Sequence, residues 1–512
     1  MSMKHFDTLM VGAGLSGIDA AVHMSQECPN KTWAILDGRK NLGGTWDLFR
    51  YPGVRSDSDM YTLGFPFKPW NDRRSIAPGS TILEYIKEAA SEFGVDKNIH
   101  YEHQVKRASW SSEDAKWTVE AEVGANKEIL RYTCNFLYMC SGYYNYAGGY
   151  MPDFPGAGNF KGPLIHPQKW PEDLDYSNKR VIVIGSGATA VTIVPAMAEK
   201  AAHVQMLQRS PTYVLGLPDW DPITEGIRKI LPGRIASAIN RMKNVWLAVG
   251  FFQISRKWPN AIRKVLRFHA KHQLGDSCDV DVHFKPSYNP WEERLCLAAN
   301  SDIFKAIKSG KAEMVTDHIE TFTEKGIKLK SGKELEADII VSATGLDLIP
   351  LGGVEFTVDG EPWLPGKSMT YKGMMFRDVP NLALASGYTN ASWTLKCDLT
   401  SQYVCRLINF MDRHNYQYCL PRNNDPTLEE LPFVDFRSGY IQRAIDKFPK
   451  QGSKAPWKLY QNYVLDIFSL KFGKLEDEVM EFVPAAAAAR SEASTASAAS
   501  VKSTSNVKQS VA

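Results

Sequence analysis

Two glycine-rich loops carry the most specific chemical signal in this sequence. The first loop follows an apolar run at residues 6–11 and precedes a helical pattern, an arrangement that lets the backbone approach a pyrophosphate at a helix N-terminus. A second apolar run ends at Asp37, whose carboxylate can accept hydrogen bonds from ribose hydroxyls. This order predicts a dinucleotide site, and the alternative is a glycine-rich turn without a ligand. The loop residues expected there are Gly12, Gly14, Ser16 and Gly17.

The second loop repeats the same arrangement, and its first glycine lies 173 positions after the first glycine of the first loop. A short apolar strand is expected at residues 180–184 and another near 203–207, followed by Arg209 and Ser210. An acid at that point would repel a 2′-phosphate, whereas Arg209 can pair with it and Ser210 can donate to it. The sequence therefore predicts NADPH rather than NADH, with an ordinary surface arginine as the alternative. The loop residues are Gly185, Ser186, Gly187, Ala188, Thr189 and Ala190.

The composition sets limits on the class of protein. A chain of 512 residues with 44% hydrophobic and 23% charged residues is typical of a soluble globular protein with two or three domains. The net charge of +3 gives no case for nucleic-acid binding, and the eight cysteines contain no Cys-x-x-Cys pair, so neither disulfides nor a metal site are expected. A strand beginning near Phe6 leaves no room for a secretory signal, and no apolar run approaches the ~20 residues of a membrane span. A cytoplasmic protein is expected, and its oligomeric state is not predicted.

The remaining elements follow from the hydrophobic patterns. Residues 81–94 are expected to be helical, and 101–133 to form an antiparallel meander. Residues 226–275 contain eleven Lys or Arg and no Asp or Glu. We expect the solvated face of a helical domain there, with attraction of NADPH phosphates or weak contact with an acidic membrane surface as alternatives. The apolar run at 244–255 is expected in the core or lining a substrate tunnel. The Ala- and Ser-rich residues after 483 predict a disordered tail.

A stretch between the two loops carries a family resemblance. It reads Phe-x-Gly-x-x-x-His-x-x-x-Trp-Pro and is similar to the fingerprint of Baeyer–Villiger monooxygenases, a class of flavoprotein monooxygenases. The alternative is a linker whose His and Trp only pack. Four other segments are similar to the ethionamide-activating branch of that family: GGTWDLFRYPG, RSDSDMYTLGF, CSGYYNY and GYTNASWTLK. The fingerprint residues are Phe160, Gly162, His166, Trp170 and Pro171.

The resemblance implies an α/β fold with two Rossmann-like dinucleotide-binding domains, one for FAD and one for NADPH, and a helical insert in the second. The expected ranges are 1–148 and 376–483 for the FAD domain, 149–171 for the fingerprint linker, 172–216 and 291–375 for the NADPH domain, 217–290 for the insert and 484–512 for the tail.

The resemblance also assigns roles to residues. Arg294 aligns with the catalytic arginine of the family, and Asp57 would hold it. The family often has Lys at the position of Glu293, which weakens the case for NADPH. His166 and Trp170 are expected to act in domain movement and NADP retention, and Asn390 and Trp393 to approach the flavin or the substrate. The implied FAD contacts are Gly44, Thr45, Trp46, Asp47, Asp57 and Val105, and the implied NADP contacts outside the second loop are Arg55 and Ser56.

The implied activity is the NADPH- and O2-dependent conversion of ketones to esters or lactones, together with oxidation of thioethers and thioamides at sulfur. One rival is a flavin-containing monooxygenase that acts mainly on sulfur or nitrogen. Another, from a different class, is a non-catalytic flavoprotein that senses NADPH. The preferred substrate and the physiological role do not follow from the sequence.

Overall fold

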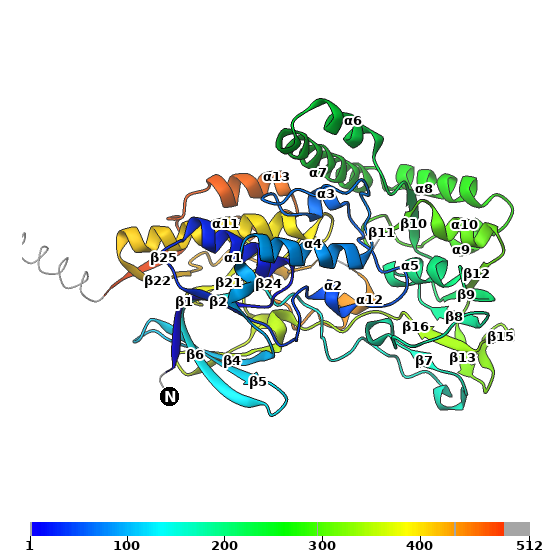
Figure 1. Ribbon diagram of the computed structural model, residues 1–512, viewed down its shortest axis with the longest axis horizontal. Helices are drawn as coiled ribbons and strands as arrows, with labels where there is room; N and C mark the ends of the chain where they lie inside the picture. Colours follow the sequence, from blue (N-terminus) through cyan, green and yellow to red (C-terminus); the bar gives the residue numbers. More distant parts are fainter. Residues whose placement is uncertain (1–2, 294, 435–436, 486–512) are drawn as a thin grey trace, which may run out of the picture.

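The computed structural model describes residues 3–293, 295–434 and 437–485 (Figure 1). The larger sheet has the strand order β18-β17-β4-β5-β6-β1-β2-β3 among these residues, with β21, β20 and β19 branching from β6. Val11 at the end of β1 pairs in parallel with Leu36 of β2 and Met139 of β6. Three carboxyl ends therefore meet at one edge. The strands are β1 Lys4–Val11, β2 Trp33–Leu36, β3 Ile99–His100, β4 His103–Ser111, β5 Lys116–Val123, β6 Glu128–Met139, β17 Glu355–Val358, β18 Glu361–Trp363, β19 Thr370–Tyr371, β20 Met375–Phe376 and β21 Leu382–Leu384.

Helices α1, α4 and α11 pack with this sheet in one hydrophobic core. In α4 the apolar side chains of Ile82, Ile86 and Ala89 recur at helical spacing and are buried, which is the pattern of an amphipathic helix on a core. Helices α1 and α11 lie side by side, although they are far apart in the sequence (Figure 1). The helices are α1 Leu15–Glu27, α2 Thr45–Leu48, α3 Met60–Leu63, α4 Gly79–Glu92 and α11 Trp393–His414.

The second sheet is parallel, with the order β12-β9-β8-β16-β7. Its central strands β8 and β16 are nearly continuous apolar runs, as expected for a sheet covered on both faces. The expected α/β fold with two Rossmann-like units is confirmed. Its elements are β7 Leu164–Ile165, β8 Arg180–Ile184, α5 Ala188–Met197, β9 His203–Gln208, α10 Asp302–Lys308, β12 Ala312–Thr316 and β16 Ile339–Ser342, with the annex β13 Ile319–Phe322, β14 Gly326–Leu329 and β15 Glu334–Glu336.

Strand pairing moves some of the expected domain limits. Strands β17 to β19 lie within residues 291–375 yet belong to the first sheet, because β17 pairs with β4 and β19 joins through β20. The range 149–171 is more than a linker, since its strand β7 forms the edge of the second sheet. At the C-terminal end, β25 (Met480–Pro484) pairs with β22 (Tyr416–Pro421), one residue past the expected limit at 483. Residues 486–512 of the expected tail lie outside the described residues.

The insert is helical, as its sequence predicts. It begins after β10 (Tyr213–Leu217), which pairs in parallel with β11 (Leu295–Ala299). Within the run 244–255, Val245 is buried, but Trp246 and Leu247 are 56% and 62% exposed, so the expectation of a core segment is wrong for those two. No described helix has the length and apolarity needed to cross a membrane. The remaining elements are α6 Pro222–Ile230, α7 Gly233–Lys257, α8 Pro259–Leu274, α9 Val280–His283, β23 Glu430–Pro432, α12 Gly439–Gln442, β24 Lys450–Gly452, α13 Tyr463–Asp466 and the π-helix Ile467–Phe472.

Candidate functional site

The first glycine loop fits tightly between β1, α1 and the end of β6. Gly12 has a φ of +106°, and a Cβ there would lie 2.6 Å from the carbonyl oxygen of Cys140. A Cβ on Gly17 would lie 1.9 Å from the carbonyl oxygen of Gly12. Only glycine fits at both positions, so the loop is held against the carboxyl edge of the sheet. Helix α1 begins directly behind it, and no side chain caps its N-terminus. Its free N–H groups can therefore receive a phosphate.

Asp37 fastens this loop to the end of β2. Its Oδ2 accepts a hydrogen bond of 2.6 Å from the backbone N–H of Ala13, and its Oδ1 accepts one of 2.8 Å from that of Arg39. Burial raises the pKa of Asp37, while these two donors act in the opposite direction. Each carboxylate oxygen has a second lone pair. Asp37, the predicted hydrogen-bond acceptor for the ribose, can therefore bind a hydroxyl group while it also positions the loop.

The segment around α2 forms the opposite wall of the first site. A Cβ on Gly14 would lie 3.5 Å from the Cα of Gly44, so two bare backbones face each other. Thr45 and Trp46 follow at the start of α2. Asp47 is buried, and its two oxygens pair with Arg39 at 2.5 Å and Arg50 at 2.8 Å. Its side chain thus holds the wall in place. Val105, expected to offer its backbone to adenine, is buried in the core and pairs with Ala121.

The N-terminal end of α11 closes the first site. Trp393 Nε1 donates a 2.9 Å hydrogen bond to Ser16 Oγ of α1, and its ring lies 5.2 Å from that of Tyr143. Asn390 is buried. Its Nδ2 donates to the carbonyl oxygen of Gln461 at 3.0 Å, and its Oδ1 has no hydrogen-bond partner among the described residues. Trp393 therefore lies next to the first loop, whereas Asn390 bonds to the backbone of the segment that contains Gln461.

A largely apolar cavity opens beside Trp393. Its empty volume is about 770 Å³, including space open to solvent. It lies at the carboxyl ends of β6 and β21, the edge at which open α/β sheets bind ligands. Sequence reasoning did not identify most of its wall. The cavity is lined by Gly142, Tyr143, Pro350, Leu351, Leu384–Thr389, Trp393, Phe433, Val434, Tyr440, Ile441, Phe448, Pro449 and Gln461.

The second glycine loop has room for a ligand at its centre. A Cβ on Gly187 would meet no atom within 4 Å, and helix α5 begins there without a capping side chain. Ala190 is buried, as its packing position requires. Ser186 Oγ donates to the carbonyl oxygen of Ser210 at 3.2 Å, which joins the loop to the end of β9. These features fit a dinucleotide whose pyrophosphate approaches the bare backbone.

Arg209 is exposed directly after β9, at the position predicted to bind the 2′-phosphate of NADPH. Glu293 lies close enough to interact with it. Burial raises the pKa of Glu293, and the positive charge of Arg209 opposes that shift. A phosphate at Arg209 would have to compete with Glu293, which is the difficulty for NADPH binding that the sequence position of Glu293 suggested.

Residues 51–57 join the two nucleotide units. A Cβ on Gly53 would lie 2.4 Å from the carbonyl oxygen of Thr192 in α5, so this segment packs on the second unit. Arg55 forms an ion pair with Asp302 at the start of α10, and Ser56 Oγ accepts from the backbone N–H of Ala77 at 3.1 Å. Arg55 therefore also joins the two units, whereas Ser56 bonds within the first unit, whose core contains Ala77.

The predicted catalytic pair is only half described. Asp57 is exposed on this interdomain segment. Arg294 lies outside the described residues, so its contact with Asp57 stays a prediction.

The fingerprint residues occupy the junction of the two units. His166 Nε2 lies 3.0 Å from the carbonyl oxygen of Gly345, and its Nδ1 accepts from the backbone N–H of Gln168 at 3.2 Å. Burial lowers the pKa of His166, so the ring is neutral and its Nε2–H donates. A Cβ on Gly162 would lie 2.3 Å from the carbonyl oxygen of Asp338. Phe160 is buried, and Trp170 packs partly buried on the second core. The histidine is thus placed to hold the linker.

Comparison with known proteins agrees with this geometry. The family described as "Flavin-binding monooxygenase-like" matches residues 56–225. The FAD-containing monooxygenase EthA of Mycolicibacterium smegmatis is 51% identical over 493 residues, covering 96% of this chain and 100% of that protein. EthA of Mycobacterium tuberculosis H37Rv is 51% identical over 480 residues, covering 94% and 98%. The solved structure of an oxidized steroid monooxygenase bound to NADP matches with a TM-score of 0.73 at 19% identity, over 94% of this chain and 100% of that one.

Proposed function

This chain belongs to the class B flavin monooxygenases, and we propose that it is a Baeyer–Villiger enzyme that converts ketones to esters or lactones. One ketone, one O2, one NADPH and one proton give one ester, one NADP+ and one water. Bound FAD, reduced by NADPH, supplies the oxygen-transfer chemistry. The observation that carries the proposal is the apolar cavity at the carboxyl ends of β6 and β21, beside the first glycine loop.

The residues of the chain bind, orient and exclude water. The first loop and the N-terminus of α1 receive one pyrophosphate, and the second loop and α5 receive the other. Arg209 and Ser210 select a 2′-phosphate. The cavity wall of Tyr143, Trp393 and Phe448 keeps water from the reacting carbonyl, which strengthens every charge interaction there. His166, neutral and donating to Gly345, positions the linker between the units.

Arg294 is the proposed catalytic residue. Negative charge develops on oxygen beside the ketone carbonyl, and a fixed positive partner stabilises it in a dry site. Arginine suits this role because it stays charged at any working pH and presents a rigid donor fork. Asp57, on the segment that packs against α5, is the proposed holder of Arg294. Sulfur oxidation by the same site is a second proposed activity, supported by the resemblance of residues 43–53 and 387–396 to the ethionamide-activating branch.

The deciding experiment gives the FAD-loaded enzyme a ketone and a thioether in parallel, with NADPH and O2, and identifies products by mass spectrometry. We expect ester or lactone from the ketone and sulfoxide from the thioether. Sulfoxide without any ester would favour a flavin-containing monooxygenase that acts on sulfur or nitrogen. Bound FAD with no oxygenated product from a broad set of ketones and sulfides would favour the NADPH-sensing flavoprotein.

The role of Arg294 is tested by Arg294→Ala, with Arg294→Lys as the charge-conserving control. Loss of one such donor typically costs roughly 10²–10³-fold in rate. We expect Arg294→Ala to bind FAD normally, to make almost no ester, and to divert its remaining NADPH oxidation to hydrogen peroxide. Arg294→Lys should rescue poorly, because an ammonium cannot reproduce the fork. A near-normal ester yield per NADPH in Arg294→Ala would remove this residue from the mechanism.

A further inference from the structure

The outer face of the helical insert carries large apolar side chains in contact with solvent. On α7, four of them recur at spacings of four, three and four, which places them on one side of the helix: Ile235, Ile239, Met242 and Trp246. We call these four residues the α7 stripe. Ile230 at the end of α6 is 81% exposed, and Phe268 on α8 is 74% exposed. Soluble monomers seldom expose apolar side chains together in this way unless the surface binds something.

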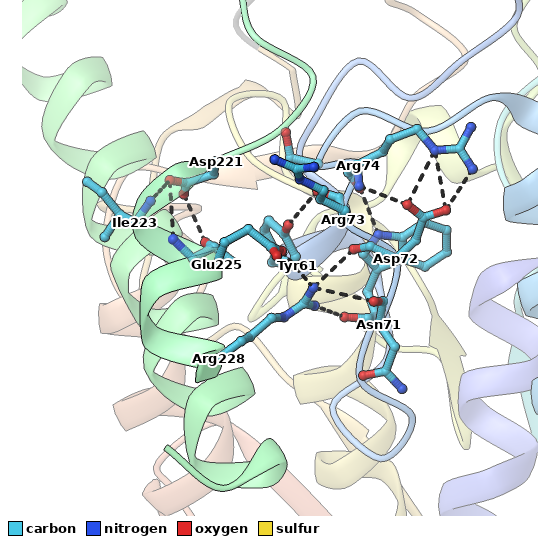
Figure 2. A network of polar contacts seen from close by, with 12 residues as sticks. Tyr61, Asn71, Asp72, Arg73, Arg74, Asp221, Ile223, Glu225 and Arg228 are labelled. Atoms are coloured by element: carbon cyan, nitrogen blue, oxygen red, sulfur yellow. Dashed lines mark hydrogen bonds and ion pairs between the residues drawn. The ribbon is translucent and has the colours of Figure 1, made fainter. Parts of the chain in front are cut away.

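The inner side of the same helices is firmly anchored, so the outer face is fixed in place. Figure 2 shows Arg228 of α6 donating to backbone carbonyl oxygens of the loop at residues 70–72. The distance from its guanidinium to the ring of Tyr61 is 5.0 Å. Asp221 caps α6 through the backbone N–H groups of Ile223 and Thr224. Arg241 of α7 donates to the carbonyl oxygen of Gly64 at 2.7 Å. Polar groups thus face the first domain, and apolar ones remain outside.

Cations predominate on this surface, although Glu225, Asp221 and Asp281 pair with Arg228, Lys243 and Arg267. Residues 226–275 contain eleven Lys or Arg and no Asp or Glu, in a chain whose net charge is only +3. Six of these cations are exposed on α6, α7 and α8, the helices that carry the apolar side chains: Lys229, Arg234, Arg256, Lys257, Lys264 and Lys271. Helices with Trp, Phe and Leu on one side and Lys or Arg around them are typical of proteins that lie on a membrane surface.

A second segment extends the same surface. Tyr463 of α13 is within hydrogen-bonding reach of Arg241 of α7. Burial raises the pKa of Tyr463, and the positive charge of Arg241 opposes that shift. Helices α13 and α7 lie along the same edge of the molecule in Figure 1. Beyond Tyr463, the side chains of Leu465, Phe468 and Phe472 are exposed at spacings of three and four. A separate part of the chain therefore adds apolar side chains to this edge.

We propose that the α7 stripe and its basic surroundings dock on a membrane surface that contains anionic lipids. The apolar side chains enter the boundary between headgroups and acyl chains, and the Lys and Arg side chains pair with lipid phosphates. Charge argues against a second copy of this chain as the occupant, because a two-fold contact would set this basic surface against itself. The docking is separate from the chemistry, and no residue of the proposed catalytic site takes part in it.

The test uses the FAD-loaded enzyme and sedimentation with vesicles of phosphatidylcholine alone or mixed with phosphatidylglycerol. We expect binding to the mixed vesicles, weak binding to the neutral ones, and release by high salt, since screening weakens attraction between surface charges. Two variants address the two components separately. Ile239→Ser with Trp246→Ser removes apolar contact, and Lys257→Gln with Lys264→Gln and Lys271→Gln removes charge. Each should weaken binding to the mixed vesicles at least tenfold.

Matched controls lie outside the surface. Ile129→Ser with Leu364→Ser alters two side chains that are 50% and 55% exposed, and Lys87→Gln with Lys97→Gln and Lys127→Gln removes the same charge elsewhere. All four variants should keep their FAD, because the altered side chains are on the surface. Failure to bind the mixed vesicles, or equal losses in test and control variants, would overturn the proposal. So would a dimer, seen by sedimentation velocity, that Ile239→Ser with Trp246→Ser abolishes.

Discussion

A buried ion cluster between α1 and α11 gives the sharpest test of how this structure is held together. His23 Nδ1 lies 2.7 Å from Glu27 Oε1, and its Nε2 lies 3.0 Å from Asp398 Oδ1 of α11. Ser401 and Gln402 donate to the carboxylates of Asp19 and Asp398 around it. Burial disfavours a charged ring, but the hydrogen bonds to Asp398 and Glu27 outweigh it and raise the pKa of His23 to about 10. The ring is therefore an imidazolium at neutral pH.

The change we consider is His23→Gln, which keeps a hydrogen-bond donor and removes the charge. A pKa that rises from 6.5 to about 10 corresponds to about 5 kcal/mol at ~1.36 kcal/mol per pH unit. Breaking a buried ion pair by removing one partner typically costs ~3–5 kcal/mol, which agrees. Because the pKa is raised in the folded state, this stability is fully present below pH 6.5 and is lost as the pH rises through about 10. Burial also raises the pKa of Asp19, to about 7, so its contribution to stability changes with pH in the same direction but is lost earlier, as the pH rises through about 7.

The assay follows the melting temperature of the FAD-loaded enzyme from pH 6 to pH 10. A loss of ~3–5 kcal/mol should lower the melting temperature of this 512-residue enzyme by roughly 3–5 °C at pH 6, and the difference from the unaltered protein should shrink toward pH 10. The control is His203→Gln, because the side chain of His203 is 37% exposed and lies 3.7 Å from Glu313, and ion pairs in contact with solvent contribute little. If the melting temperature of His23→Gln is lowered by the same amount at every pH, or if His203→Gln lowers it equally, the reasoning is refuted.

Three further predictions address the nucleotide sites and the C-terminal strand. Gly187→Ala should melt normally, because its Cβ meets no atom within 4 Å, yet raise KM roughly tenfold for both NADPH and NADH by obstructing the pyrophosphate; an unchanged KM would place the pyrophosphate elsewhere. Arg209→Ala should raise KM for NADPH and leave KM for NADH nearly unchanged, since a charge-assisted pair contributes ~1.5–3 kcal/mol. Glu293→Gln should lower KM for NADPH alone. Equal effects of either variant on both nucleotides would contradict the assignment of Arg209. A chain ending at Ala485 should keep its melting temperature and FAD, whereas one ending at Val479 should lose stability with strand β25, and thermal scans of the two distinguish these outcomes.

The nucleotide loops could be predicted from sequence because steric necessity fixes their residues. A Cβ on Gly17 would lie 1.9 Å from a carbonyl oxygen, so glycine there is required by the turn itself. Asp37 followed from its place at the end of an apolar run, although its bonds to Ala13 and Arg39 did not. Local geometry of this kind leaves a local pattern in the sequence.

The cavity and some domain limits could not be predicted, because they depend on contacts between distant segments. Tyr143, Trp393 and Phe448 come together only when the C-terminal residues pack against the first sheet, and no hydrophobic periodicity in the sequence predicts that packing. Strand β17 joins β4 through backbone hydrogen bonds that any sequence could make. Strand β6 is one continuous strand, antiparallel to β5 and parallel to β1, and it extends past residue 133, where the predicted meander ends.

The arrangement of α1 and α11 connects stability to the proposed chemistry. Contacts between them advance together along both helices, from Ser16 with Cys397, through Asp19 with Ser401, to Glu27 with Asn409, so the helices run parallel. Their positive N-terminal ends therefore share one edge, beside the first loop and the cavity. Parallel dipoles repel each other, and the buried His23 cluster opposes that repulsion. The same cluster thus keeps two positive helix ends directed at the place where anionic groups must bind.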